Sequence, residues 1–149
     1  MSLGIFQTFH LLIYLKVILY LLFVQRKTNI FNIHDPIGLR YLFYLRVSLS
    51  PLRSHKNRHG FDDTPSDKCL CNHGIEDNNH LLSSCTLFAV QRVSLRASVV
   101  INLLKYNLNN MINNLQLHLY GHRTINFADN RIIILSTIAF IKDLSLIHI

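Results

Sequence analysis

The chain has 149 residues, of which 50% are hydrophobic and 15% are charged, and its formal net charge is +7. This length supports one domain, or a small domain with an appendage, and the hydrophobic content excludes a chain that is disordered throughout. The positive charge favours a polyanionic partner or an anionic membrane surface over an acidic protein. All three cysteines lie between positions 69 and 85, which indicates reduced thiols in an intracellular compartment and not a disulfide framework.

The first segment along the chain is a strongly apolar stretch over residues 3–25. It is long enough to cross a hydrocarbon core of about 30 Å as a helix, although Lys16 near its middle opposes insertion. Two interpretations stay open for residues 1–28: a hydrophobic helix buried against the rest of the domain, or a membrane-spanning helix. In the second case Arg26 and Lys27 hold the C-terminal side in the cytoplasm.

Helix signals then recur in the domain that we expect over residues 29–145. Asp35 followed by Pro36 is typical of a helix entrance, with the aspartate as cap and the proline in the first turn. Ser50 and Pro51 repeat this signal, which predicts a short helix or a turn. Further on, Asp77 is expected to cap a helix whose first turn carries the next histidine.

The last third of the domain also reads as helical. The asparagine-rich residues 107–110 predict a break, and residues 111–120 predict a helix that ends at Gly121. Asp129 is expected to cap a final helix. The apolar stripe of that helix consists of Ile133, Ile134, Thr137, Ile138 and Ile141. Because this run is rich in β-branched residues, a strand is an alternative there.

The cysteines and one histidine form a motif over residues 69–85: Cys-x-Cys, eight residues, His, four residues, Cys. Three thiolates and one imidazole are a known ligand set for tetrahedral zinc. Because the protein fills all four positions, the ion is expected to be structural and not catalytic. The predicted ligands are Cys69, Cys71, His80 and Cys85.

Alternatives to this ligand set stay open. The three thiols can be unrelated, and His73 is a rival to His80. On a continuous helix His80 and Cys85 lie about 140° apart, so the helix must begin after His80 or loosen before Cys85. Glu76, four residues before His80, is predicted to accept a hydrogen bond from the second imidazole nitrogen.

Several landmarks in order carry a resemblance to a known family. Residues 30–56 contain the pattern hydrophobic-x-Arg-hydrophobic-x-Leu-Ser-x-Leu-x-x-His-Lys. This run resembles the segment before the zinc motif in the endonuclease/reverse transcriptases of non-LTR (LINE-type, jockey-like) retrotransposons. The cysteine motif with residues 59–64 before it, and residues 119–121 after it, are similar to the zinc-binding tail of that family. The resemblance covers most of the chain, residues 29–143.

The resemblance implies a small, mainly helical tail that follows the polymerase thumb and helps to hold RNA template or target DNA. It places the metal role on the four ligands already named and nucleic-acid contacts on Arg46, Arg53, Lys56 and Arg58. It does not extend to the polymerase palm or the endonuclease. The only similar run, Phe61 with two aspartates after it, lies in a turn-rich loop. We therefore expect no enzymatic activity.

The sequence thus predicts a mainly α fold: a small helical domain around an irregular zinc-knuckle-like loop, preceded by a hydrophobic N-terminal helix. The expected function is non-catalytic binding of structural Zn²⁺ and of the RNA or DNA backbone, in the cytoplasm or the nucleus. A full-length reverse transcriptase is a candidate partner. The alternatives are a small single-pass membrane protein, anchored through residues 3–25 with its zinc-binding domain in the cytoplasm, and a non-functional retroelement remnant.

Overall fold

The computed structural model describes residues 33–144, which are mainly helical as predicted. The α-helices are α2 (Pro36–Arg46), α3 (Arg53–Arg58), α4 (Asn78–Ser83), α5 (Ala89–Lys105), α6 (Leu115–Tyr120) and α7 (Phe127–Asp143). Short 3₁₀ turns lie at Thr86–Phe88 and Asn109–Met111. No β-strand occurs in residues 33–144, although one antiparallel bridge joins Lys68 and Ile75. The predicted N-terminal helix and membrane span lie outside the described residues.

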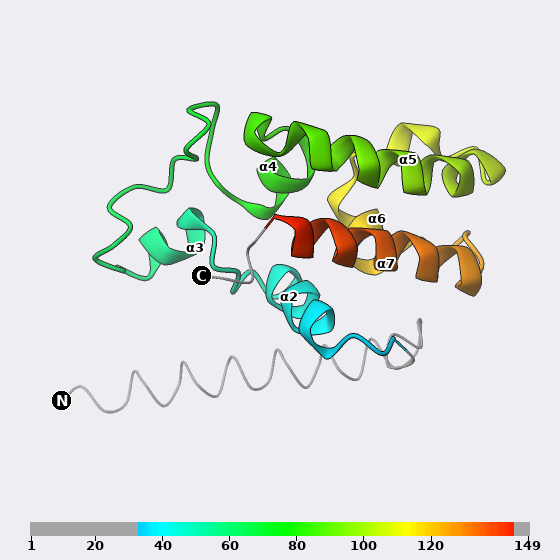
Figure 1. The fold of residues 1–149 in the computed structure, drawn as a ribbon, viewed down its shortest axis with the longest axis horizontal. Helices are drawn as coiled ribbons and strands as arrows, with labels where there is room; N and C mark the ends of the chain where they lie inside the picture. Colours follow the sequence, from blue (N-terminus) through cyan, green and yellow to red (C-terminus); the bar gives the residue numbers. More distant parts are fainter. Residues whose placement is uncertain (1–32, 145–149) are drawn as a thin grey trace. The chain divides into compact units, whose positions relative to one another are not determined.

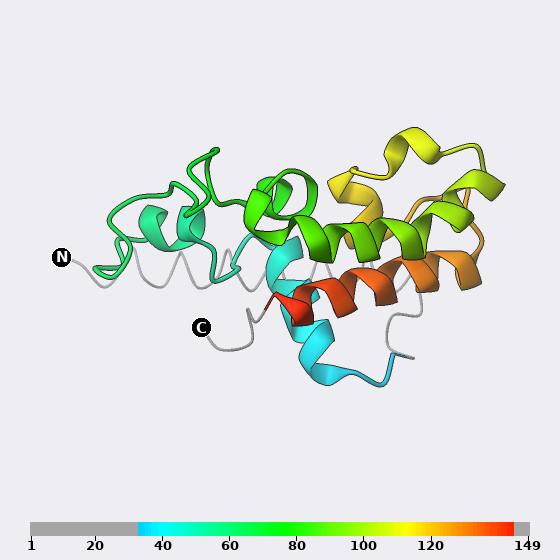
Figure 2. The same cartoon turned by 45° about the horizontal axis from the view of Figure 1, so that its top comes forward.

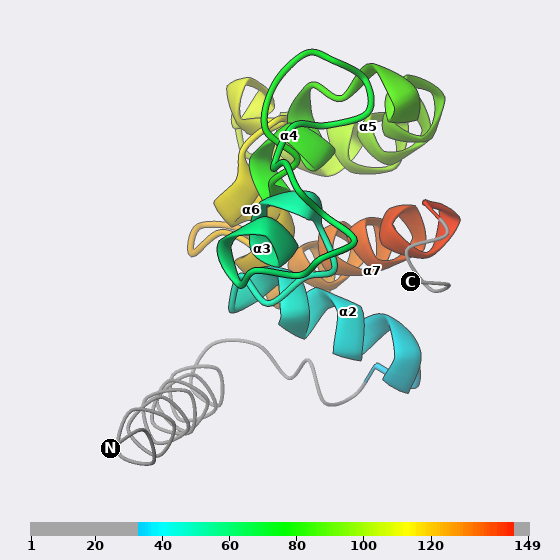
Figure 3. The same cartoon turned by 90° about the vertical axis from the view of Figure 1, so that its left-hand side faces the viewer.

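The core lies along the two longest helices. α5 and α7 run side by side, and α2 packs against α7 on its other side (Figures 1 and 2). Seen from the side, α2, α7 and α5 follow one another as three layers, with α6 and α4 beside them (Figure 3). The predicted stripe of α7 is buried in this core, so the strand alternative is wrong. Full burial of one isoleucine side chain stabilises such a core by roughly 1.5–3 kcal/mol.

The start of α2 follows the sequence signal. Asp35 caps the helix by accepting a hydrogen bond from the backbone N–H of Gly38 at 2.8 Å, and Pro36 occupies the first turn. Gly38 allows a close approach of α7, because a Cβ atom at this position would overlap the side chain of Ile138. Asp35 also pairs with Lys142 near the end of α7 at 2.9 Å. The cap therefore ties α2 to α7 as well.

The short helix expected after Ser50 and Pro51 is present, but it begins at Arg53 and the serine does not cap it. A distant residue does this instead. The Glu76 carboxylate accepts a hydrogen bond from the backbone N–H of Arg53 at 3.1 Å. The Glu76 carbonyl accepts another from the N–H of Ser54 at 3.2 Å. The loop before α4 thus holds the start of α3.

Two expectations in the last third are corrected. Residues 111–120 do not form one helix: α6 begins at Leu115, after Asn114 accepts a hydrogen bond from the N–H of Leu117 at 3.1 Å. Gly121, with φ of 74°, ends it as predicted. The cap of α7 is Asn126 and not Asp129, whose own backbone N–H donates to the Asn126 side chain at 2.8 Å.

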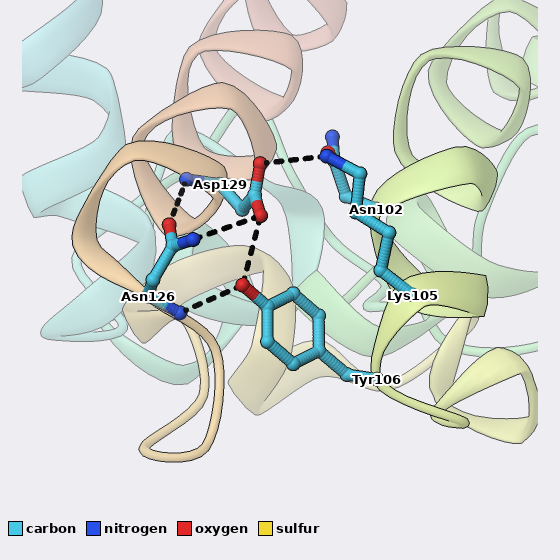
Figure 4. Close-up of polar contacts among 5 residues, drawn as sticks. All are labelled: Asn102, Lys105, Tyr106, Asn126 and Asp129. Atoms are coloured by element: carbon cyan, nitrogen blue, oxygen red, sulfur yellow. Dashed lines mark hydrogen bonds and ion pairs between the residues drawn. The ribbon is translucent and has the colours of Figure 1, made fainter.

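Asp129 lies inside the first turn of α7, where it joins α7 to the end of α5 (Figure 4). Its carboxylate accepts hydrogen bonds from the Tyr106 hydroxyl at 2.8 Å and from Lys105 at 3.3 Å. Asn126 donates a third at 3.2 Å. Asn126 occupies the cap position, and the Asp129 carboxylate makes these tertiary contacts instead.

α5 belongs to a strongly apolar helical stretch. In the described part of the chain, the helical stretch Thr86–Lys105 is the one that meets the length and composition of a membrane span. One side of α5 packs on the core through Leu95, Val99 and Leu103. The other side exposes Val90, Val93, Ile101 and Leu104. α5 is therefore buried on one side only.

Candidate metal centre

A tight hairpin positions the first two cysteines. Its arms meet at the bridge between Lys68 and Ile75. The N–H of Cys69 donates to the carbonyl of Gly74 at 2.8 Å, and the N–H of Asn72 donates back to the carbonyl of Cys69 at 3.0 Å. Asn72 and Gly74 have φ angles of 61° and 137°, which an asparagine and a glycine tolerate best. This turn is why one intervening residue suffices to bring both thiols to the same site.

The start and the end of α4 position the other two side chains. Asp77 caps the helix by accepting a hydrogen bond from the N–H of His80 at 2.7 Å, as predicted, and so places this histidine in the first turn. The helix ends at Ser83, and the N–H of Cys85 then donates to the carbonyl of His80 at 2.8 Å. This turn brings Cys85 back beneath His80. Of the two options for the helix, loosening before Cys85 is the one found.

The four predicted ligands converge. All are buried, and their ligand atoms lie within 4.8 Å of one another. The His80 Nε2 atom is 3.1 Å from the Cys71 sulfur, and the sulfurs of Cys69 and Cys85 are 3.5 Å apart. A disulfide has a length of about 2.05 Å, so these are separate thiols. Metal–sulfur distances of about 2.3 Å at tetrahedral angles place sulfurs about 3.8 Å apart, which fits this cluster.

The second nitrogen of His80 has a different partner from the one predicted. Its Nδ1 atom lies 3.1 Å from the hydroxyl of Ser84. The prediction that Glu76 supports His80 is wrong, because the Glu76 carboxylate caps α3. The rival ligand His73 does not join the thiols either. Its ring nitrogen contacts the carbonyl of Cys71, while its backbone N–H donates to the Cys71 sulfur at 3.4 Å.

The electrostatics of the thiols favour a cation between them. Burial raises the pKa of Cys69 to about 12, and the neighbouring sulfurs of Cys71 and Cys85 add to this rise. Burial also opposes ionisation of Cys71. The N–H of His73 and the side chains around that sulfur nevertheless lower its pKa to about 6. The thiolate of Cys71 therefore forms more readily than that of Cys69, and a cation bound between them would stabilise both thiolates.

Two side chains next to the site were missed by the sequence reasoning. Arg92 of α5 is buried and donates from Nη1 to the carbonyl of Leu81 in α4 at 3.3 Å. One turn later Arg96 donates from Nη2 to the carbonyl of Ser83 at 3.2 Å. The signal was present, because Arg92 lies on the same helix face as the core residues Leu95 and Val99.

The four basic residues assigned to nucleic-acid contact differ in their surroundings. Arg46 donates from Nε to the carbonyl of Leu119 at 2.6 Å, and its guanidinium lies 5.0 Å from the centre of the Tyr120 ring. Arg46 therefore links α2 to α6, and a role in nucleic-acid contact does not fit this residue. The other three lie on α3. Arg58 is exposed, Arg53 is half-buried, and Lys56 pairs with Asp63 at 3.2 Å.

Comparison of the chain with protein-family models, with curated proteins and with solved structures gives no match. The centre is therefore defined by the geometry of residues 69–85 and their neighbours. On that geometry, the fold brings together three buried thiols and one imidazole as a candidate metal centre.

Proposed function

We propose that Cys69, Cys71, His80 and Cys85 bind a structural zinc ion. The observation that carries this proposal is the convergence of their four buried ligand atoms within 4.8 Å. Thiolate ligands select soft or borderline ions, and three sulfurs with one nitrogen in a tetrahedral arrangement favour zinc. Because protein side chains occupy all four coordination positions, no position is open for water, and the ion has a structural role.

The loop that carries the first two ligands has little else to hold it. Among residues 60–77, only Thr64, Cys69 and Cys71 are buried. Such a loop cannot offset its loss of conformational entropy by burying apolar surface. The ion joins this loop to α4 and so replaces a hydrophobic core at this end of the domain.

We further infer that the domain is a non-catalytic nucleic-acid-binding module, similar to the zinc-binding tail of a retrotransposon reverse transcriptase. The resemblance over residues 29–143 and the net charge of +7 support this function. The contacts of Glu76 with Arg53 and Ser54 add to this support, since they connect the metal loop to the basic helix α3. On this proposal the metal holds α3 in place, and α3 contacts phosphates.

The metal proposal is tested by elemental analysis of the purified chain. We expect one equivalent of zinc in the parent and none in a variant with Cys69→Ser and Cys71→Ser. A matched control is His73→Ala, which removes the rival imidazole and should leave one equivalent. A parent chain without metal would refute the proposal, and so would a Cys69→Ser, Cys71→Ser variant that keeps its zinc.

The nucleic-acid proposal is tested by measuring affinity for single-stranded RNA over a range of salt concentrations. A variant with Arg53→Gln and Arg58→Gln leaves the pair of Lys56 and Asp63 in place. Each lost phosphate contact should reduce the salt slope by about 0.7, hence about 1.4 for both. The control is Arg123→Gln with Arg131→Gln, which removes the same charge from exposed positions elsewhere. Equal losses in the two variants contradict a specific role of α3.

A further inference from the structure

Arg92 is a buried cation for which the described residues offer no carboxylate partner. Arg92 is only 5% exposed, and its Nε atom is buried without a hydrogen-bond partner. The ion pairs within residues 33–144 involve Lys56, Lys105 and Lys142, and none involves Arg92. A guanidinium remains protonated in proteins, and a buried charge is costly unless an opposite charge compensates it. The fold must therefore supply negative charge close to this position.

The thiols of the candidate metal centre would supply that charge once ionised. Arg92 donates a hydrogen bond to the carbonyl of Leu81, the residue next to the proposed ligand His80. Burial and the neighbouring Arg96 lower the pKa of Arg92, whereas the charges of Cys85 and Cys71 raise it. A divalent ion bound by three thiolates and one neutral imidazole carries a net charge of −1. One guanidinium beside it makes the buried assembly neutral.

We propose that Arg92 is the counter-ion of the metal–thiolate centre. This inference rests on the proposed function of the four ligands. It assigns to α5 an electrostatic role in metal binding, because the guanidinium stabilises the ionised thiols that the metal requires. It also gives a reason for a charged residue on the core-facing side of α5.

Arg96 provides a matched control on the same helix. It makes the same kind of contact, from its guanidinium to a carbonyl near the end of α4, at 3.2 Å. It also donates to Asn113 at 3.1 Å and is partly exposed, so that water can solvate its charge. Removal of Arg96 therefore costs a carbonyl contact without removing a buried charge.

The test compares the zinc affinity of Arg92→Met, Arg92→Lys and Arg96→Met by competition with a chelator of known affinity. Loss of a supporting residue beside a metal ligand typically costs about 10- to 100-fold in metal affinity, and we expect this for Arg92→Met. Arg92→Lys keeps the charge and should retain most of the affinity, and Arg96→Met should bind as the parent does. The thiolate-to-metal absorption of the Co²⁺-loaded proteins should be the same in all four, since the ligand set is unchanged.

The outcomes separate this inference from the proposed function. A parent chain that binds no metal overturns both. A parent that binds zinc, with Arg92→Met equally tight or reduced only as much as Arg96→Met, overturns the counter-ion role alone. Equal losses in Arg92→Met and Arg92→Lys also overturn it, since they assign the effect to packing. If Arg92→Met does not fold, Arg92→Gln, which keeps hydrogen-bond donors without the charge, replaces it in the comparison.

Discussion

The two ends of this domain are held together by different forces. Around α5 and α7, stability comes from buried aliphatic side chains such as Val99, Leu103, Ile133 and Ile141. The residues before α4, 60–77, lack such a core. The ordered features of residues 60–85 are a hairpin, two helix caps and the four converging ligands. On the proposed function, one small domain thus combines a region that folds by excluding water with a region that folds by binding an ion.

The largest effect should come from removing the metal. Zinc binding contributes about 10–16 kcal/mol in zinc-finger peptides, so its loss exceeds what the loop can compensate. After treatment with a strong chelator, we expect rapid proteolysis within residues 60–77. The far-UV circular dichroism should retain most of its helical signal, because α5 and α7 are held together by their own buried side chains. Uniform loss of all helices would contradict the division into two regions.

The next largest effect should come from the aliphatic core. Ile133 is 0% exposed, and truncation of a buried isoleucine to alanine costs about 2–5 kcal/mol. Ile133→Ala should lower the free energy of unfolding in urea by this amount and leave zinc stoichiometry unchanged. Its neighbour Ile132 is 43% exposed, and Ile132→Ala should change stability by less than about 0.5 kcal/mol. Equal effects of both substitutions would argue against the buried face of α7.

A smaller effect separates the partners of the metal loop. Ser84→Ala removes the hydroxyl beside His80 and should weaken zinc binding by about 10-fold, or about 1.4 kcal/mol. Glu76→Gln should weaken zinc binding much less than Ser84→Ala, because that carboxylate caps α3 and does not contact His80. It should instead increase hydrogen exchange at the N–H groups of Arg53 and Ser54. The assignment of these two roles is reversed if Glu76→Gln weakens zinc and Ser84→Ala does not.

The smallest effect should be the pH dependence of the junction between α5 and α7. The hydrogen bond from Tyr106 lowers the pKa of Asp129, and Lys105 and Asn126 lower it further. A carboxyl group with a lowered pKa in the folded state contributes stability above its ordinary pKa, near 3.8. This contribution is lost as the pH falls through the lowered value. In Asp129→Asn the thermal stability should depend less on pH below 4 than in the parent, and an unchanged profile would rule out this role.

The features that sequence reasoning predicted are local ones. The caps at Asp35 and Asp77 and the four ligands follow from residue types at short spacings, because a turn or one helical turn suffices to connect them. Asn126 and Asp129 are both good capping residues by type, so the local sequence does not distinguish them; Asn126 is the cap, and Asp129 accepts a hydrogen bond from Tyr106 instead.

The features that could not be predicted join residues far apart in the chain. Arg46 donates to a carbonyl 73 residues away, and Glu76 accepts from a residue 23 positions earlier. No local pattern shows whether an arginine faces water or a distant carbonyl. Glu76 and Ser84 are each four residues from His80, and Ser84 is its partner because the distant Arg53 engages the Glu76 carboxylate.

The position of Glu76 has a consequence for binding equilibria. It lies between the ligands Cys71 and His80, yet its carboxylate and its carbonyl hold the first turn of α3. On the proposed function, the conformational order of α3 and the occupancy of the metal centre are therefore coupled. Thermodynamic linkage makes such coupling reciprocal. A partner that binds the ordered form of α3 raises the affinity of the domain for the ion. The ion raises the affinity of the domain for that partner by the same factor.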